Sequence, residues 1–331
     1  MTTASLDVIA VGNAIVDIIG RCDDAFLARH GAAKGSMRLV DAAAVVALYK
    51  DMGPAIEISG GSAANTMVGV ASLGGTSAFI GKVADDEFGR IFAHDIKSAR
   101  VAFDTQPAKG GAPTARSLIL VTPDGERTMN TFLGVSPELT VAEIDSQQIA
   151  AAKIVYLEGY LFDRDEAKAA FRQAAAHAAK AGRKVALSLS DSFCVDRHRA
   201  EFLDFIRGHV DILFANEAEV TSLYQSKSFD EAATHAARDC KVAVLTRSAK
   251  GAVIHTGSSS VTVPADAVSS VVDTTGAGDL YAAGFLFGHA RGLDMTTCGR
   301  LGALAAAEII SHVGARPQTS LATLAKAREL I

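Results

Sequence analysis

Short apolar runs recur along the chain, and alanine-rich stretches with helical spacing separate many of them. The runs are apolar at consecutive positions, as in strands whose two faces are both covered by helices. Alternation of such strands with helices is typical of an α/β fold built on a parallel sheet. Strands are predicted at Asp7–Gly12, Thr76–Ile80, Lys153–Leu157, Val185–Leu189, Ile212–Phe214 and Val242–Leu245, and helices at Asp165–Lys180 and Asp230–Asp239, with Gly182 and Gly208 as helix stops.

Two segments interrupt this alternation. Residues 18–59 contain strand-like pieces and one short helical stretch. In residues 102–133, apolar and polar positions alternate with period two on both sides of Asp124-Gly125, a dipeptide that predicts a hairpin. We expect the two segments to pair into a small sheet beside the main core. The predicted domains are a large α/β domain of residues 1–17, 60–101 and 134–331, and a discontinuous β lid of residues 18–59 and 102–133.

The composition disfavours several classes of protein. The 331 residues include 32 Lys and Arg against 37 Asp and Glu, a net charge of −5, so we expect no concentrated basic surface for nucleic acid. The mean hydropathy of +0.22 comes largely from alanine, and no apolar stretch is long enough to cross a membrane. The four cysteines form no C-x-x-C pair, and no export signal is evident. We expect a cytoplasmic protein without disulfides, membrane contacts or nucleic-acid partners.

A glycine-rich turn is the most informative feature of the sequence. Residues Asp273–Asp279 read Asp-Thr-Thr-Gly-Ala-Gly-Asp, follow a strand predicted to end at Val272 and precede a helix predicted to run to Arg291. Backbone N–H groups in such a turn, at the positive end of a helix, form an anion site. The residues expected to form it are Gly276, Ala277 and Gly278.

Asp279 stands beside the predicted anion site. A carboxylate there suits a base that takes a proton from an attacking hydroxyl while the amides stabilise the phosphoryl group, so we predict phosphoryl transfer with Asp279 as general base. The alternative is a turn in which Asp279 only caps the helix. A dinucleotide-binding loop and a Walker loop are disfavoured, because Tyr281 replaces the third glycine of the first and Val83 follows Gly81-Lys82 in the second.

Four motifs in order resemble those of the ribokinase or PfkB family of carbohydrate and nucleoside kinases. They are Gly60–Asn65, Gly81–Gly89 (with Ala84 where the family has a glycine), Asn216–Glu219 and Asp273–Asp279. The resemblance implies a ribokinase-like fold, in which a mostly parallel central sheet has helices on both faces and a small β-sheet lid covers the acceptor site. It also implies ATP as phosphate donor and Mg²⁺ as cofactor.

Within that family, Gly12–Asp17 and Gly125–Gly134 resemble the adenosine kinase branch. The resemblance implies that Asp17 accepts hydrogen bonds from the ribose 2′- and 3′-hydroxyls, because a carboxylate accepts two O–H donors at once. It implies that Arg127, on the lid hairpin, neutralises charge on the transferring phosphate; the alternative is a solvated hairpin arginine. The other residues expected at the acceptor are Asn13, Gly61, Ser62 and Asn65, with Tyr160 and Phe193 around the purine unless these two are simply core residues.

The resemblance also implies the residues that contact ATP and metal ions. Glu219 would organise Mg²⁺ through water, since Mg²⁺ keeps much of its hydration shell. The alternative for Glu219 is a surface position on a helix. The ATP-binding residues would be Asn216, Thr246, Ser248 (where the family has glycine) and Gly278, and a monovalent cation such as K⁺ would lie near Asp273, Thr275 and Gly314.

The sequence therefore predicts an ATP-dependent kinase that phosphorylates the 5′-hydroxyl of a nucleoside, converting adenosine to AMP in purine salvage. A kinase of the same fold acting on a free sugar or sugar acid, such as ribose, fructose or 2-keto-3-deoxygluconate, is the nearer alternative. A non-catalytic nucleotide-sensing module is the second alternative, disfavoured because both Asp279 and Arg127 are present. Monomer and homodimer are both left open.

Overall fold

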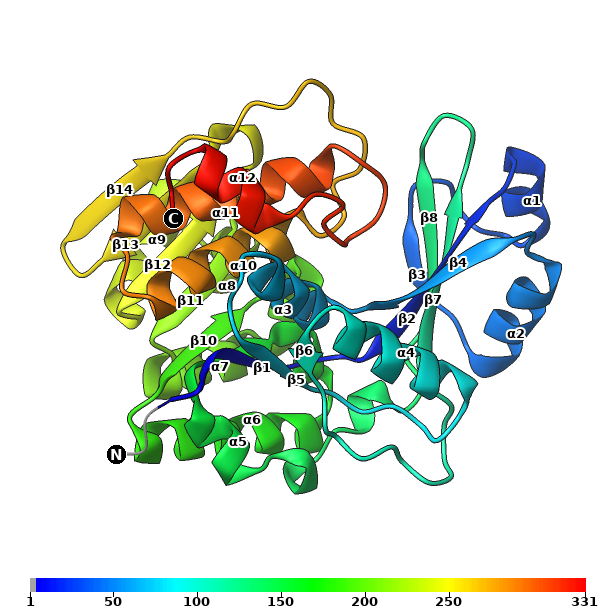
Figure 1. Ribbon diagram of the computed structural model, residues 1–331, viewed down its shortest axis with the longest axis horizontal. Helices are drawn as coiled ribbons and strands as arrows, with labels where there is room; N and C mark the ends of the chain where they lie inside the picture. The colour runs from blue at the N-terminus through cyan, green and yellow to red at the C-terminus, as the bar shows by residue number, and fades with distance from the viewer. Residues whose placement is uncertain (1–3) are drawn as a thin grey trace.

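The computed structural model describes residues 4–331, which form two β-sheets (Figure 1). The strand order of the larger sheet is β14-β13-β12-β11-β10-β9-β1-β5-β6, with parallel neighbours from β12 to β6 and antiparallel pairing at β13 and β14. This topology confirms the predicted α/β fold with a mostly parallel sheet. The strands are β1 (Leu6–Val11), β5 (Ser77–Ile80), β6 (Val101–Ala102), β9 (Ala152–Glu158), β10 (Lys184–Ser188), β11 (Ile212–Asn216), β12 (Val242–Thr246), β13 (Ala252–Thr256) and β14 (Ser259–Val263).

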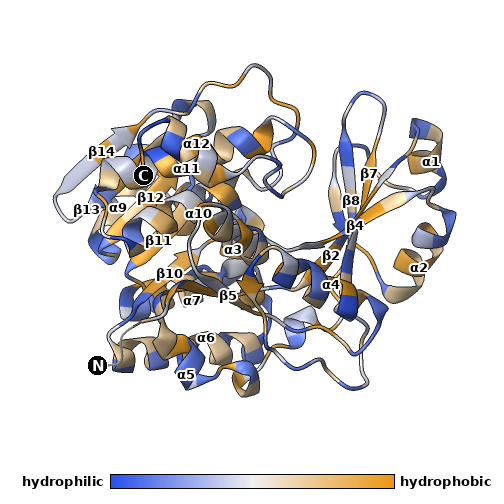
Figure 2. Cartoon of the chain, viewed as in Figure 1, coloured by the Kyte–Doolittle hydropathy of each residue, from blue (hydrophilic) through white to orange (hydrophobic). Residues whose placement is uncertain are grey.

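Helices cover both faces of this sheet, as predicted. Along β1, Val8 and Ala10 belong to one apolar cluster, and Ile9 and Val11 belong to the cluster on the opposite face. Full burial of such a side chain contributes about 1.5–3 kcal/mol, so both layers hold the sheet. Figure 2 shows the apolar strands between these layers. One layer contains α3 (Ser62–Ser72), α4 (Glu87–Ser98), α10 (Ala277–Ala290), α11 (Met295–Ile310) and α12 (Leu321–Ala327); the other contains α5 (Ser146–Ala151), α6 (Asp165–Ala181), α7 (Ser192–His209), α8 (Glu217–Tyr224) and α9 (Phe229–Asp239).

The smaller sheet lies beside the large one and draws its strands from two separate parts of the chain (Figure 1). Its order is β3-β8-β7-β2-β4, and the predicted hairpin is present as β7 and β8, with Gly125 in the turn at φ +86°. Helices α1 and α2 pack on its outer face. The elements are β2 (Ile15–Arg21), α1 (Asp24–Arg29), β3 (Met37–Leu39), α2 (Ala42–Asp51), β4 (Ala55–Gly60), β7 (Ala115–Val121) and β8 (Arg127–Phe132). We call these elements the lid.

Two predictions of local structure are wrong. The segment before the glycine-rich turn is irregular, and the N–H of Val272 donates to the carbonyl of Ile310 at the end of α11 (2.8 Å) rather than to a strand. Consecutive valines favour a strand, but here a tertiary contact overrides that preference. Gly208 does not stop its helix: α7 continues to His209 and has Val210 as C-cap. Gly182, in contrast, ends α6 in the left-handed conformation at φ +68°.

Among residues 4–331, no helix is both long and apolar enough to span a membrane.

Candidate active site

Asp279 lies in the first turn of α10, directly after the glycine-rich turn. The N-cap of α10 is Gly276, so the capping alternative for Asp279 is wrong. Its two carboxylate oxygens instead accept hydrogen bonds from the Ser62 hydroxyl (2.6 Å) and the Asn65 side-chain amide (3.0 Å) of α3. Burial raises the pKa of Asp279, while these hydrogen bonds and the charge of Arg316 act in the opposite direction. The result is a fixed carboxylate with increased proton affinity, as a general base requires.

The glycine-rich turn beside Asp279 leaves two of its backbone N–H groups unpaired within the described chain. Gly276 has φ +79°, a conformation that a side chain would strain. The Ala277 N–H donates to the Thr274 carbonyl (3.2 Å), whereas within the described chain the N–H groups of Gly276 and Gly278 have no partner. Gly278 is exposed, and a Cβ added there would meet no atom within 4 Å. The geometry therefore leaves two of the three predicted amides free for an anion.

Replacing Gly278 with alanine tests this anion site. The added methyl group would meet no atom of the protein within 4 Å, and alanine has a higher helix propensity than glycine. We therefore expect the melting temperature to stay level or rise slightly. A phosphoryl group close to the amide would collide with the methyl group, so kcat should fall about 100-fold, the size expected for losing one oxyanion donor. Gly208→Ala is the matched control, because its Cβ also meets open space in a helix. Equal turnover in the two variants would contradict the anion site.

Asp17 lies on β2, on the face opposite the apolar core of the lid. Its neighbours Val16 and Ile18 are buried in that core, so alternation along the strand directs Asp17 to the other side. Burial raises its pKa to about 6; the positive charges of Arg316 and Arg127 lower the pKa, and the charge of Asp279 raises it. The two carboxylates predicted at the acceptor therefore influence each other across one site.

The Gly60-Gly61 pair allows the chain to pass close to the segment that carries Asn13 and Asp17. A Cβ at Gly60 would collide with the carboxylate of Asp17, and one at Gly61 would collide with the carbonyl oxygen of Asn13. Gly61 also has φ +98°, where side chains are strained. These contacts explain why glycine is needed where β4 passes into α3.

Glu158 is a buried site residue that none of the sequence motifs predicts. It ends β9, and its carboxylate accepts hydrogen bonds from the Asn13 side-chain amide (2.7 Å) and the backbone N–H of Ala63 (2.8 Å). Burial raises its pKa to about 7 against the effect of these hydrogen bonds. Since the Asn13 carbonyl oxygen also accepts from the Ser136 hydroxyl (2.9 Å), Asn13 is fixed by protein contacts. The available signal was a charged residue at the end of a buried parallel strand.

Arg316 is the second missed residue. It lies between α11 and α12 and donates to the carbonyl oxygens of Ser59 (2.9 Å) and Ala64 (2.9 Å). Burial lowers its pKa to about 10, while its charge lowers the pKa of both Asp17 and Asp279. A buried cation near two carboxylates makes their simultaneous ionisation less costly. No sequence motif marks this arginine.

Arg127 reaches from the lid hairpin to the glycine-rich turn. Its Nη1 donates to Asp273, and its side chain is only 7% exposed, so the solvated alternative is wrong. The other carboxylate contacts of Asp273 are the N–H groups of Thr275 (3.0 Å) and Gly314 (3.0 Å). The structure thus brings together Arg127 and the three residues predicted for a monovalent cation.

Tyr160 and Phe193 are exposed rather than core residues, with 36% and 75% of their surfaces accessible. Tyr160 lies in η3 (Gly159–Asp163), and Phe193 lies in the first turn of α7. Burial of its hydroxyl end and nearby carboxylates, Asp279 among them, raise the pKa of Tyr160. Tyr160 therefore lies close enough to Asp279 for their charges to interact, and both aromatic side chains are accessible from outside the core.

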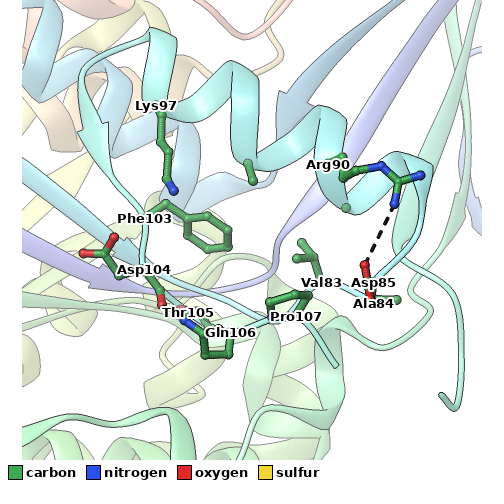
Figure 3. Close-up of a pocket in the computed structure, with 12 residues that line it drawn as sticks. Val83, Ala84, Asp85, Arg90, Lys97, Phe103, Asp104, Thr105, Gln106 and Pro107 are labelled. Carbon is green, nitrogen blue, oxygen red and sulfur yellow. Dashed lines mark hydrogen bonds and ion pairs between the residues drawn. The ribbon is translucent and has the colours of Figure 1, made fainter. Parts of the chain in front are cut away.

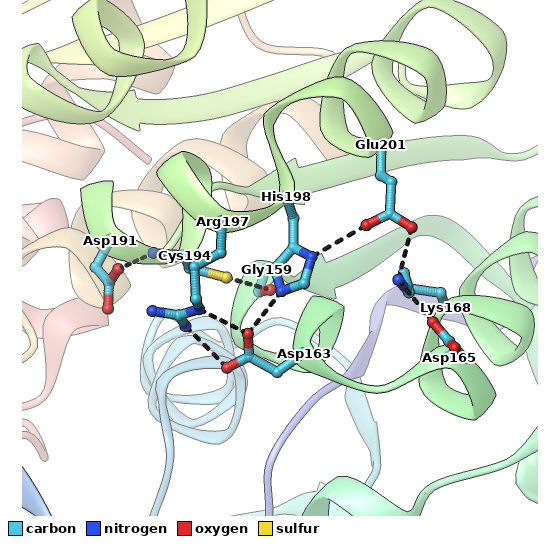
Figure 4. A network of polar contacts seen from close by, with 9 residues as sticks. All are labelled: Gly159, Asp163, Asp165, Lys168, Asp191, Cys194, Arg197, His198 and Glu201. Atoms are coloured by element: carbon cyan, nitrogen blue, oxygen red, sulfur yellow. Dashed lines mark hydrogen bonds and ion pairs between the residues drawn. The ribbon is translucent and has the colours of Figure 1, made fainter.

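A network of ion pairs fastens η3 to α7 (Figure 4). Arg197 grips both oxygens of Asp163 with Nε (3.0 Å) and Nη2 (2.9 Å), and His198 Nε2 lies 2.7 Å from Asp163. His198 departs from helical geometry and also contacts Glu201 (3.0 Å). These contacts fix the two segments that carry the exposed aromatic residues.

The predicted ATP-side residues follow β11 and β12. Asn216 caps α8, and the oxygens of Glu219 accept from its backbone N–H (2.9 Å) and side-chain amide (2.7 Å). Glu219 is buried, which rules out the surface-helix alternative; burial and the charges of Asp191 and Asp279 raise its pKa to about 7. Thr246 ends β12, and the exposed Ser248 has φ +51°, the left-handed conformation that glycine adopts more easily.

The acidic residues fit Mg²⁺ held through water. Glu219, Asp191 and Asp279 interact electrostatically, so a divalent cation near them would be favoured. Within residues 4–331, no group of three His, Cys, Asp or Glu side chains is placed to hold a metal directly. Because Mg²⁺ usually keeps several waters, these carboxylates would hold it through its water shell.

The Gly81–Gly89 motif has a structural role. Asp86 caps α4 through the Gly89 N–H (2.8 Å) and also accepts from the Thr114 hydroxyl (2.6 Å), which ties α4 to the start of β7. A cavity of about 250 Å³ lies beside this helix, between α4 and the segment 103–107 (Figure 3). None of the predicted site residues lines it.

Comparisons with known proteins identify relatives with two kinds of substrate. Residues 57–321 match the profile of the pfkB family carbohydrate kinases. The adenosine kinase from Sinorhizobium meliloti is 53% identical with a TM-score of 0.91, over 98% of this chain and 100% of that chain. The probable sugar kinase from Rhizobium etli CFN 42 is 51% identical with a TM-score of 0.92, over 99% and 100%. The probable fructokinase-6, chloroplastic, of Arabidopsis thaliana is 34% identical over 238 residues, which span 69% of this chain and only 61% of that protein.

Proposed function

This chain belongs to the PfkB family of carbohydrate kinases, which transfer a phosphoryl group to a hydroxyl group, and we propose that its acceptor is the 5′-hydroxyl of adenosine. Kinases of this family use ATP with Mg²⁺. Adenosine combines a vicinal diol with a flat, largely apolar base, and a free sugar has only the hydroxyl-bearing part. The choice between them therefore depends on what surrounds Asp17.

The observation that carries the proposal is an apolar row on the lid face that bears Asp17. Ile19 follows Asp17 by two positions and so shares its face. The strand register aligns one residue from each strand of the lid in this row: Ile56, Ile19, Ile119, Met129 and Met37. The two ends of the row are exposed (Ile56 67%, Met37 53%), whereas Ile119 in its middle is buried at 1%. Apolar side chains that share a face with a diol-binding carboxylate, and that are exposed at the two ends of their row, favour a nucleoside over a free sugar.

The polar groups around Asp279 support transfer to a hydroxyl. The carbonyl oxygen of the Asn65 side chain is buried without a partner, so it is available to accept from an acceptor hydroxyl. In the proposed reaction the 5′-oxygen forms a bond to the γ-phosphorus of ATP as the bond to the leaving ADP oxygen breaks. The hydroxyl proton passes to Asp279, and the amides of Gly276 and Gly278 hold the phosphoryl oxygens. Bound Mg²⁺ would neutralise charge on the ATP phosphates.

The raised pKa values predict an acid limb in the pH profile. Asp17 must be ionised to accept two hydroxyl donors, and Asp279 must be ionised to accept a proton. Because the pKa of Asp17 is about 6 and that of Asp279 is also raised, kcat/KM for adenosine should fall as the pH drops below about 6. Asp17→Asn should remove one of the two ionisations and make the limb shallower. A constant kcat/KM from pH 5 to pH 8 would contradict these assignments.

A free-sugar kinase is the second candidate, favoured by the sequence similarity to the plant fructokinases. Ligand-induced thermal shifts separate the two candidates, because a ligand that binds the native state stabilises it according to its affinity. Adenosine, guanosine, ribose, fructose and 2-keto-3-deoxygluconate form the panel. Adenosine should raise the melting temperature most. A melting temperature that rises with a free sugar but not with adenosine would contradict the proposal and support the second candidate.

A further inference from the structure

Both carboxylate oxygens of Asp273 accept hydrogen bonds from N–H donors. Oδ1 accepts from Thr275 (3.0 Å), and Oδ2 accepts from Gly314 (3.0 Å) and from the guanidinium of Arg127. The Asp273 and Arg127 side chains are 5% and 7% exposed. The ion pair is therefore largely shielded from water. Charges interact more strongly in such a buried environment than at the surface.

These residues do not fit a monovalent cation. K⁺ is bound by several oxygen atoms that replace its hydration shell. Here Thr275 and Gly314 donate backbone N–H groups to the Asp273 carboxylate. The positive charge beside that carboxylate is supplied by Arg127. We propose that the lid arginine takes the place of a monovalent cation beside the anion site, and that Asp273 is the residue that positions it.

The unpaired side of the guanidinium indicates what Arg127 is positioned for. Its Nε and Nη2 are buried without a partner among the described residues, and buried donors are unfavourable unless an acceptor reaches them. Because Asp273 begins the turn that carries Gly276 and Gly278, we expect these two donors to face the anion site. Phosphoryl oxygens would satisfy them.

Because Arg127 belongs to the lid, the position of its charge depends on lid closure. A bound cation would be present whether or not the lid is closed, whereas Arg127 belongs to β8 and contacts Asp273 only while the lid lies against the large domain. Charge neutralisation is thus coupled to closure, which also excludes water. The inference rests on the proposed phosphoryl transfer at this site, and it is independent of the acceptor's identity.

The first test compares salts on the wild-type protein. Melting temperature and turnover are measured in potassium, sodium and tetramethylammonium chloride at equal ionic strength. We expect the same values in all three, since a filled position has no room for K⁺. A melting temperature or a rate that rises specifically with potassium concentration would overturn the inference.

The second test uses chemical rescue of Arg127→Ala by guanidinium ion at millimolar concentrations. Loss of the arginine should lower kcat by about 100-fold or more, and added guanidinium should restore part of it by binding at Asp273. In the double variant with Asp273→Asn the rescue should disappear, because the positioning carboxylate is gone. Equal rescue in the single and double variants would show that Asp273 does not position the arginine.

A readout without acceptor separates this inference from the choice of substrate. In Asp273→Asn, amides at the Arg127 end of β8 should exchange hydrogen faster, since the hairpin loses its ion pair with the glycine-rich turn. Lys34→Gln is the control. It removes an exposed ion pair to Asp124 at the tip of the same hairpin and leaves the contact with the glycine-rich turn in place. Unchanged exchange in Asp273→Asn would overturn the inference even if adenosine is the substrate. If adenosine is not the substrate, the melting and hydrogen-exchange results still test the role of Arg127 and Asp273.

Discussion

Asp279→Asn should lower kcat by about 1,000-fold while the protein folds and binds both substrates, because general-base catalysis typically contributes 100- to 10,000-fold. Asparagine can still accept the hydrogen bond from the Ser62 hydroxyl, but it cannot take a proton from the acceptor. Removing a buried charge whose pKa is raised should not greatly destabilise the fold. Steady-state kinetics give kcat and KM, and thermal melting checks the fold.

Asp294→Asn is the matched control for this substitution. Asp294 caps α11 by accepting from the Thr297 N–H (3.0 Å), and asparagine is an equally good cap. The control should therefore keep both its stability and its turnover. Near wild-type turnover in a folded Asp279→Asn protein would contradict the assignment of the base.

Asp17→Asn should lower kcat/KM for adenosine by about 100- to 1,000-fold, because a site built to bind hydroxyls discriminates strongly through them. An amide accepts through one oxygen and leaves its NH₂ facing a second hydroxyl, so the vicinal diol loses a charge-assisted partner. The wild type should strongly prefer adenosine to 2′-deoxyadenosine, and the variant should lose most of that preference. Kinetics with both nucleosides measure the change.

Glu57→Gln provides the control on the same sheet. Glu57 lies on β4 opposite Ile18 and accepts from the Tyr49 hydroxyl (2.7 Å) on the outer side of the lid. Its loss should leave the preference for adenosine unchanged. An undiminished preference in Asp17→Asn would show that Asp17 does not bind the diol.

Local patterns in the sequence were sufficient to predict most of the fold. Consecutive apolar residues in β1 predict a strand covered on both faces, and Val8 and Ile9 do pack against opposite helix layers. Asp124-Gly125 predicts the hairpin, and Gly125 adopts the left-handed conformation that ends a three-residue hairpin loop. These features depend on neighbours along the chain, which the sequence displays directly. The strand predicted to end at Val272 failed because its partner is the distant carbonyl of Ile310.

The glycine-rich turn could be predicted for the same reason, but its surroundings could not. The contacts of Asp279 come from Ser62 and Asn65, more than 200 positions away, and Glu158 and Arg316 reach the site only through the tertiary fold. The resemblance to a kinase family brought Ser62 and Asn65 into the prediction as acceptor residues. In the structure they also hold the carboxylate of Asp279, the proposed base. A lone buried charge carries no motif, so Glu158 and Arg316 became visible only in three dimensions.

Direct detection of product tests the central claim that this kinase phosphorylates a nucleoside. The protein is incubated with ATP, Mg²⁺ and either adenosine, ribose or fructose, and the phosphorylated product of each reaction is identified and its rate of formation measured. We predict rapid formation of AMP, with kcat/KM for adenosine at least about 100-fold above that for either free sugar. A sugar phosphate formed efficiently, with no AMP from adenosine, would contradict the account.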